Sequence, residues 1–164
     1  MKRIVPVVLA LVFAASVSIA AEAAKTEKSS ASAPSNVDQE FNNFWNKFKK
    51  AVLNGDNKTI SGIKSSRIKA MDISRKDKNF LTAVQKAEVD KTVKIRFGND
   101  VQSVTLKKIT PQEAIEIGLN EASISEIEKV GFAYILNLFD YHIYAFTKIN
   151  GQFKMTDYEY KGGD

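Results

Sequence analysis

Cysteine is absent from this chain of 164 residues, and histidine occurs once, at His142. Without cysteine, the chain forms no disulfide, and it lacks the lipid-modified cysteine that anchors bacterial lipoproteins. A single histidine with no cysteine cannot supply the ligands of the usual zinc sites. We therefore expect no metal and no cofactor, and a core that is held together by packing alone.

Signals of several common activities are missing as well. The sequence has no glycine-rich phosphate-binding loop, and no serine stands in a motif typical of a Ser/His/acid triad. Its acidic residues are too scattered for a calcium site, since Asp56-Asn57 and Asn99-Asp100 are isolated pairs. The net charge of +5 comes from lysines interspersed with acidic residues. Because there is no concentrated basic stripe, we expect no nucleic-acid partner.

Long apolar runs are confined to the N-terminus. Two basic residues precede an apolar stretch over residues 4–15, which is too short to span a bilayer. Small residues then fit signal peptidase cleavage after Ala20 or after Ala23. This pattern predicts a Sec-type signal peptide over residues 1–23, and hence a periplasmic or secreted protein with no transmembrane segment in the mature chain.

The composition changes twice after the predicted cleavage site. Residues 24–36 are rich in serine, alanine and lysine and contain no apolar residue larger than alanine, so we expect a flexible linker. A single domain is predicted over residues 37–161, followed by a short tail over residues 162–164.

The start of this domain has the strongest helical periodicity in the chain. Its apolar stripe has the spacing i, i+3, i+4, i+7 and i+11 and consists of Phe41, Phe44, Trp45, Phe48 and Val52. Gly55 is typical of a helix end, and Asp56 is a good cap for a second, shorter helix. Such an aromatic stripe is either core or the lining of a ligand pocket, and the sequence leaves both open.

The middle of the chain gives weaker signals. Ser74 and Asp77 precede a helical pattern that includes Phe80, Leu81 and Val84, while residues 92–97 fit either the end of this helix or a strand. Residues 101–109 are typical of a strand. Thr110, Pro111 and Glu113 then predict the start of a short helix, with threonine as cap and proline in the first turn.

From Glu126 onward the sequence predicts an antiparallel meander, with strands in 127–138, 141–149 and 152–160. Asn150-Gly151 is a strong signal for a two-residue hairpin turn. With that turn, Ile149 lies opposite Gln152, and an unbroken register pairs Phe146 with Met155, Tyr144 with Asp157 and His142 with Glu159. One sheet face then carries Phe146, Phe153, Met155, Tyr144, Asp157, His142 and Glu159, and the other carries Tyr141, Tyr158 and Tyr160.

The two ends of the domain together resemble the NTF2-like superfamily, and more narrowly its small exported proteins of unknown function. In that family an aromatic N-terminal helix is followed by Gly-Asp, here Gly55-Asp56. The last hairpin often reads Phe-x-Lys-x-x-Gly-x-Phe/Trp-Lys, here with Phe146, Lys148, Gly151, Phe153 and Lys154. The resemblance implies an α+β fold with N-terminal helices packed on a curved antiparallel sheet, an NTF2-like or cystatin-like roll.

The resemblance implies several functions, which the sequence does not separate. A ligand-binding module would hold a small apolar molecule between helix and sheet, with Phe41, Trp45, His142, Tyr144, Asp157 and Glu159 as candidate lining residues. An interaction module would contact an envelope protein, or a second copy of the chain, through Tyr141, Tyr158 and Tyr160. An isomerase- or hydratase-like enzyme would use Asp157 or Glu159 as base, with His142 or Tyr144 as acid or orienting donor. Cross-strand polar pairs of this kind are mostly structural, so we expect a binding module rather than an enzyme.

Overall fold

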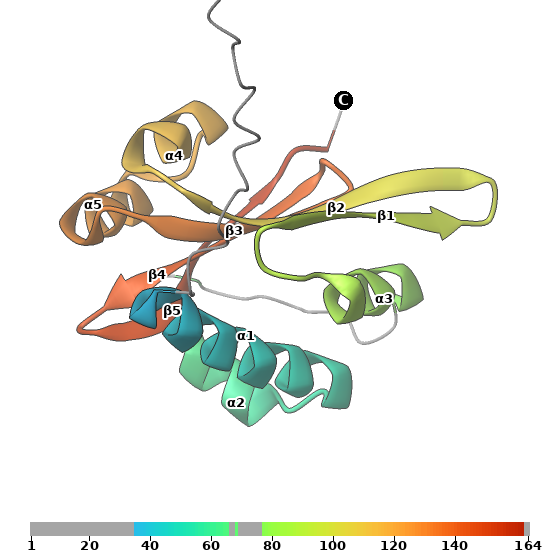
Figure 1. The fold of residues 1–164 in the computed structure, drawn as a ribbon, viewed down its shortest axis with the longest axis horizontal. Helices are drawn as coiled ribbons and strands as arrows, with labels where there is room; N and C mark the ends of the chain where they lie inside the picture. The colour runs from blue at the N-terminus through green and yellow to red at the C-terminus, as the bar shows by residue number, and fades with distance from the viewer. Residues whose placement is uncertain (1–34, 66–67, 69–76, 163–164) are drawn as a thin grey trace, which may run out of the picture. The chain divides into compact units, whose positions relative to one another are not determined.

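The fold is given by a computed structural model, which describes residues 35–65, 68 and 77–162. These residues form an α+β fold with five helices and a five-stranded antiparallel sheet, in agreement with the predicted fold class (Figure 1). The helices are α1 (Asn36–Asn54), α2 (Asn57–Ile63), α3 (Lys78–Lys86), α4 (Pro111–Ile117) and α5 (Glu121–Val130). The strands are β1 (Lys91–Phe97), β2 (Asp100–Ile109), β3 (Ala133–Leu138), β4 (His142–Ile149) and β5 (Gln152–Tyr160). The expected signal peptide lies outside the described residues, as does most of the expected linker.

The strands lie in the sheet in the order in which they occur in the chain, and each pairs antiparallel with the next. Helices α1, α2 and α3 cover one face of the curved sheet, and α4 and α5 cover the other (Figure 1). Each face has its own hydrophobic core. The larger core lies under α1 and α3, and the smaller one lies under α4 and α5.

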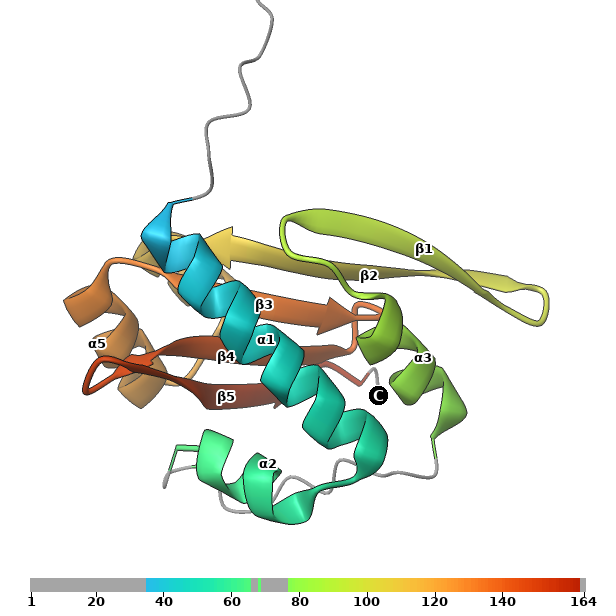
Figure 2. The same cartoon turned by 60° about the horizontal axis from the view of Figure 1, so that its bottom comes forward.

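Helix α1 forms where the aromatic stripe predicted it. Ser35 caps its first turn by accepting a hydrogen bond from the backbone N–H of Asp38, and Gly55 ends it with a φ of 61°. The helix crosses the strands β3, β4 and β5 (Figure 2). All residues of its stripe except the partly buried Phe44 are buried, and the Phe41 ring stacks on Tyr134 of β3 with ring centroids 3.5 Å apart.

Three other local predictions are confirmed. Asp56 caps α2 through the backbone N–H of Thr59, and Thr110 forms a capping box with Glu113 at the start of α4. Asn150 and Gly151 form the turn between β4 and β5 with positive φ values of 51° and 77°, as a two-residue hairpin requires.

The structure decides between helix and strand for residues 92–97, and it contains one helix that the sequence did not predict. Residues 91–97 form β1, while the helix before them is α3, capped by Asp77. The predicted start of the meander at Glu126 is wrong, because residues 121–130 form helix α5 and β3 begins only at Ala133. The larger apolar residues of α5 are few and β-branched, so they do not reveal its helical periodicity. Ser74, which was expected at the start of α3 with Asp77, lies outside the described residues.

The predicted β4–β5 register is correct only near the turn. It holds from Ile149–Gln152 as far as Phe146–Met155, where Thr156 adds one residue to β5 and forms a β-bulge. Beyond the bulge Ala145 lies opposite Asp157. The predicted pairs of Tyr144 with Asp157 and of His142 with Glu159 are therefore wrong.

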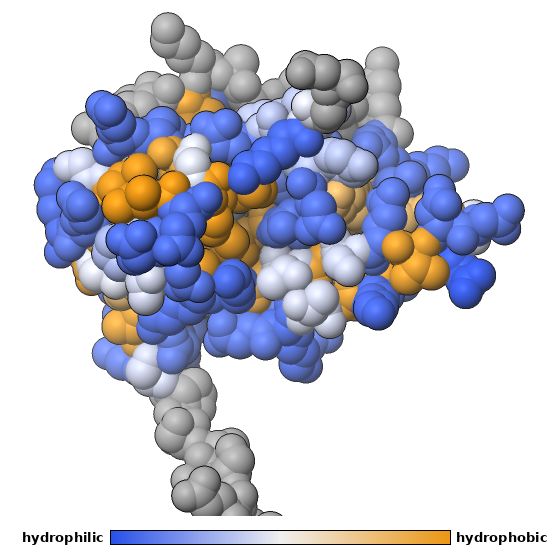
Figure 3. All heavy atoms as spheres, turned by 90° about the horizontal axis from the view of Figure 1, so that it is seen from above, coloured by the Kyte–Doolittle hydropathy of each residue, from blue (hydrophilic) through white to orange (hydrophobic). Residues whose placement is uncertain are grey.

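The β1–β2 hairpin extends past the rest of the sheet (Figure 2). Pairing of β2 with β3 begins only at Val104, so the part of β2 before it is paired with β1 alone. Seen from the side of α4 and α5, hydrophobic atoms gather over these two helices and, separately, at the far end of this hairpin (Figure 3). Exposed apolar side chains in these two regions include Ile115 and Val101.

Candidate functional site

An open groove of about 880 Å³ lies between α1, α2 and the β4–β5 hairpin. We call it the hairpin groove. It is lined by Glu40, Asn43, Phe44 and Lys47 from α1, by Lys58, Thr59, Gly62 and Ile63 from α2, and by Gly151, Gln152, Phe153 and Lys154 from the hairpin. Its volume lies within the range of sites that bind small molecules.

Local structure holds the three walls in place. The left-handed Gly55 and the cap Asp56 turn the chain back between α1 and α2. After α2, the backbone N–H of Ser65 donates to the carbonyl of Met155, which attaches the end of α2 to strand β5. The ammonium of Lys154 donates to the carbonyl of Gly62 at 2.6 Å, which adds a second link between hairpin and helix.

The apolar part of the groove comes from two adjacent rings, one from α1 and one from β5. Phe44 of α1 and Phe153 of β5 have ring centroids 5.7 Å apart, and Phe44 is only partly buried. Behind them the Phe41 ring contacts Phe153 edge-on, with centroids 5.1 Å apart. The groove therefore has an aromatic floor that is continuous with the main core, and an apolar ligand could cover it.

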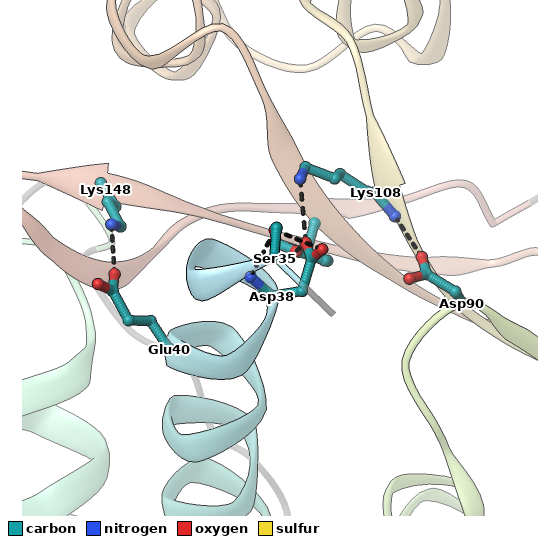
Figure 4. A network of polar contacts seen from close by, with 7 residues as sticks. Ser35, Asp38, Glu40, Asp90, Lys108 and Lys148 are labelled. Carbon is teal, nitrogen blue, oxygen red and sulfur yellow. Dashed lines mark hydrogen bonds and ion pairs between the residues drawn. The ribbon is translucent and has the colours of Figure 1, made fainter. Parts of the chain in front are cut away.

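The polar part of the groove is mostly cationic. Lys47, Lys58 and Lys154 line it together with one acidic residue, Glu40. Glu40 forms an ion pair with Lys148 of β4, which lies next to the groove (Figure 4). Within the described residues, the ammonium groups of Lys47 and Lys58 form no hydrogen bond or ion pair. These two cations, on two different helices, are therefore available to a ligand.

A second polar cluster fixes the N-terminal end of α1 against the sheet (Figure 4). Asp38 accepts hydrogen bonds from the hydroxyls of Ser35 and Tyr134, at 2.6 Å and 2.5 Å, and pairs with the ammonium of Lys108 at 3.0 Å. The backbone N–H of Lys108 donates to Asp90. The hydroxyls of Ser35 and Tyr134 hold the pKa of the Asp38 carboxyl far below its usual range, and Lys108 contributes to this lowering.

This cluster predicts a pH-dependent stability. Because the pKa of Asp38 is lowered on folding, its stabilising effect is complete above the unfolded-state pKa of about 4 and is lost as the pH falls toward the folded-state value. We expect Asp38→Asn to lower the free energy of unfolding by about 1 kcal/mol at pH 7. In urea titrations, the difference from the unmodified protein should narrow as the pH falls below about 4.

The matched control is Asp100→Asn, which removes the same charge on the exposed β1–β2 hairpin. A difference between the Asp38 variant and the unmodified protein that is constant from pH 7 to pH 2 would contradict this prediction.

Three of the predicted ligand-binding residues, Phe41, Trp45 and Tyr144, belong to the main core. The side chains of Phe41 and Trp45 are 0% and 2% exposed. The indole N–H of Trp45 donates to the carbonyl of Ala87 after α3, and its ring packs on Phe48. The inner face of α1 is thus filled by protein, and the open groove lies beside it, along Phe44.

His142 and Tyr144 lie together with two of the predicted interface tyrosines. Because of the bulge, Tyr144 faces Tyr158 and His142 faces Tyr160. Directly opposed residues share a face, so these four rings form a ladder on the α1–α3 face of the sheet. His142 Nδ1 lies 2.9 Å from the Tyr158 hydroxyl, and burial lowers the pKa of His142. Tyr141 belongs to the turn before β4 and is exposed.

Asp157 and Glu159 lie on the other face of the sheet. Their partners in β4 are Ala145 and Ile143, which belong to the core under α4 and α5. Asp157 is buried and accepts a hydrogen bond from the backbone N–H of Asn120, the cap of α5, at 2.8 Å. Burial, with the charge of Asp157, raises the pKa of Glu159. The structure therefore does not bring these carboxylates together with His142 or Tyr144.

Sequence reasoning missed most residues of the hairpin groove. Asn43 and Lys47 fall on the polar side of the α1 pattern, where a solvated surface is the usual expectation. Both turns that shape the groove were predictable, at Gly55-Asp56 and at Asn150-Gly151. No local signal places the tip of the hairpin against α2, because that contact depends on how the helices pack on the sheet.

No family model matches the chain, and comparisons with curated proteins and with solved structures give no match either. Within the described residues, no three acidic or histidine side chains come together in a way that could hold a metal ion. None of the helices described in the structure has the length and apolar character needed to cross a membrane.

Proposed function

We propose that this protein is an exported binding module of the NTF2-like type that holds a small ligand with an apolar part in the hairpin groove. The observation that carries the proposal is the pair of rings, Phe44 and Phe153, at the floor of an open groove of about 880 Å³. Concave sites with an apolar floor and a few polar groups are the usual sites for small molecules. The NTF2-like assignment is supported by α1 lying across a curved antiparallel sheet, and export is supported by the N-terminal sequence pattern.

Binding is favoured over catalysis by the kinds of side chain in the groove. Its polar residues are mainly lysines, amides and a threonine, and its one carboxylate, Glu40, is paired with Lys148. A general base needs a side chain that is free to accept a proton near neutral pH. The catalytic alternative relied on carboxylates beside His142, and Asp157 and Glu159 lie on the opposite face of the sheet.

Gly62 offers a direct test because it lines the groove without being needed for its shape. A Cβ added at Gly62 meets no atom within 4 Å, and the backbone there is ordinary helix. We expect Gly62→Trp to fold normally, since the indole would extend into open space, and to block the groove. Binding of the neutral fluorescent probe N-phenyl-1-naphthylamine should fall at least about tenfold, which corresponds to the loss of the contact with the two rings.

The matched control is Gly62→Ala, which changes the same backbone position but leaves the groove open. It should bind the probe like the unmodified protein. Far-UV circular dichroism and the melting temperature would verify that both variants are folded. Equal probe binding by the tryptophan variant, or no binding by the unmodified protein, would overturn the proposed function.

A further inference from the structure

From the charges around the hairpin groove we infer that its ligand is an anionic amphiphile, a molecule with an apolar chain or ring that ends in a carboxylate or a phosphate. The inference rests on the proposed function, since it requires that the groove binds a ligand. The apolar end would lie on Phe44 and Phe153, and the anionic end would lie between the lysines of α1 and α2.

The first argument is the imbalance of charge in the lining. Three lysines and one glutamate line the groove, and the glutamate is already paired with Lys148 from outside the lining. Asp56 interacts with Lys58 from outside the lining. A neutral ligand would leave the rest of this positive charge uncompensated, and a cationic ligand would increase it. An anionic group is the partner that reduces the electrostatic free energy of the bound state.

The second argument is the arrangement of the cations. Lys47 extends from α1 and Lys58 from the first turn of α2, and both line the same groove. Neither ammonium forms a hydrogen bond or ion pair with the described part of the chain. Lys154 differs, because its ammonium is held by the carbonyl of Gly62. An anion placed between Lys47 and Lys58 would therefore gain charge-assisted hydrogen bonds without breaking one within the protein.

The third argument is the presence of an aromatic floor beside these cations. A basic surface without an apolar part attracts any anion weakly and without preference for its tail. Here the rings of Phe44 and Phe153 lie in the same groove as Lys47 and Lys58. The combination predicts that a ligand gains affinity from both parts, from the tail by contact with the rings and from the head by contact with the ammonium groups.

The experiment compares probes that share one tail and differ in the head group. Octanoate, octyl phosphate, 1-octanol and octylammonium carry the same chain, and acetate carries the carboxylate alone. Each would be titrated into the purified, ¹⁵N-labelled chain, with dissociation constants taken from amide shifts of groove residues such as Gly62 and Gly151. We expect octanoate or octyl phosphate to bind at least about tenfold more tightly than octanol, and octylammonium to bind most weakly.

Variants without the two lysine charges test whether Lys47 and Lys58 cause the preference for anionic probes. The double variant Lys47→Gln/Lys58→Gln should bind octanol as before and should lose the preference for the anionic probes. The matched control, Lys94→Gln/Arg96→Gln, removes two positive charges from the exposed side chains of β1, away from the groove. It should keep the preference, because the inference attributes it to contact and not to the net charge of the protein.

The outcomes separate this inference from the proposed function. Equal binding of octanol and octanoate would overturn the inference while the proposed function stands. Acetate binding as tightly as octanoate would also overturn it, since the site would then recognise an anion without a tail. A preference that survives in the double variant contradicts the assigned lysines. Absence of binding by all tailed probes would overturn both proposals. A preference for carboxylate over phosphate, or the reverse, supports the inference and identifies the head group.

Discussion

Deletion of Thr156 is expected to remove the bulge in β5 and to leave the protein folded. Thr156 is the extra residue of the bulge, so without it Asp157 still lies opposite Ala145, and regular alternation keeps Asp157 on the α4–α5 face and Tyr158 in the main core. The free energy of unfolding should fall by about 2 kcal/mol, because the buried hydroxyl of Ser123 loses the carbonyl of Thr156 as its acceptor.

Urea unfolding followed by circular dichroism would measure this effect. The matched control is Thr156→Ala, which keeps the length of the strand and loses only a weak hydrogen bond from the hydroxyl to the carbonyl of Ala145, at 3.4 Å. It should cost about 1 kcal/mol. If the deletion variant shows no cooperative unfolding transition while the alanine variant does, the fold needs the bulge itself and not only the pairing of Asp157 with Ala145.

Replacement of Asp157 by alanine should lower the free energy of unfolding by about 2 kcal/mol. Asp157 is 4% exposed, and its two carboxylate oxygens accept hydrogen bonds from the backbone N–H groups of Asn120 and Tyr158, each at 2.8 Å. Alanine leaves both donors without this partner and frees the start of α5 from the sheet. Asp157→Asn should cost less, because one amide oxygen can still accept from one donor.

The same variants test a structural role for Asp157 by a second measurement. The charge of Asp157 is one cause, after burial, of the raised pKa of Glu159. In both variants, the pKa of Glu159 measured by NMR should therefore fall toward its ordinary value. The matched control is Glu128→Gln on the exposed side of α5, which removes a charge without touching this contact. Unchanged stability in the alanine variant would show that α5 does not depend on the Asp157 contact.

The sequence was most informative where one short segment determines the structure. The stripe of α1, the caps Asp56 and Thr110, and the Asn150-Gly151 turn each follow from the conformations that a few neighbouring residues prefer. The α+β fold class could be predicted from these signals, together with the β-rich end. Helix α5 could not, since its isoleucines also suit a strand and only its packing under β4 and β5 decides between them.

The candidate site was less predictable for two physical reasons. Thr156 carries no local signal of a bulge, yet it reverses the faces of all residues from Asp157 onward, so one inserted residue separated the predicted carboxylates from His142. The hairpin groove depends on contacts between distant segments, such as the carbonyl of Gly62 with Lys154. Sequence patterns report the periodicity of one element and contain little information on which elements meet.

The sequential order of the strands has a consequence for the order of folding. Each strand pairs with its neighbour in the chain, so the sheet can grow from β1 to β5 by closures between consecutive strands, the longest of which includes α4 and α5. The hairpin groove cannot form in this way, because Glu40 to Ile63 must meet Gly151 to Lys154. A chain that emerges N-terminus first during synthesis would carry only the helical part of the groove until its last strand had emerged. Ligand binding would then mark the end of folding, and a bound ligand would hold together the first and last elements of the domain.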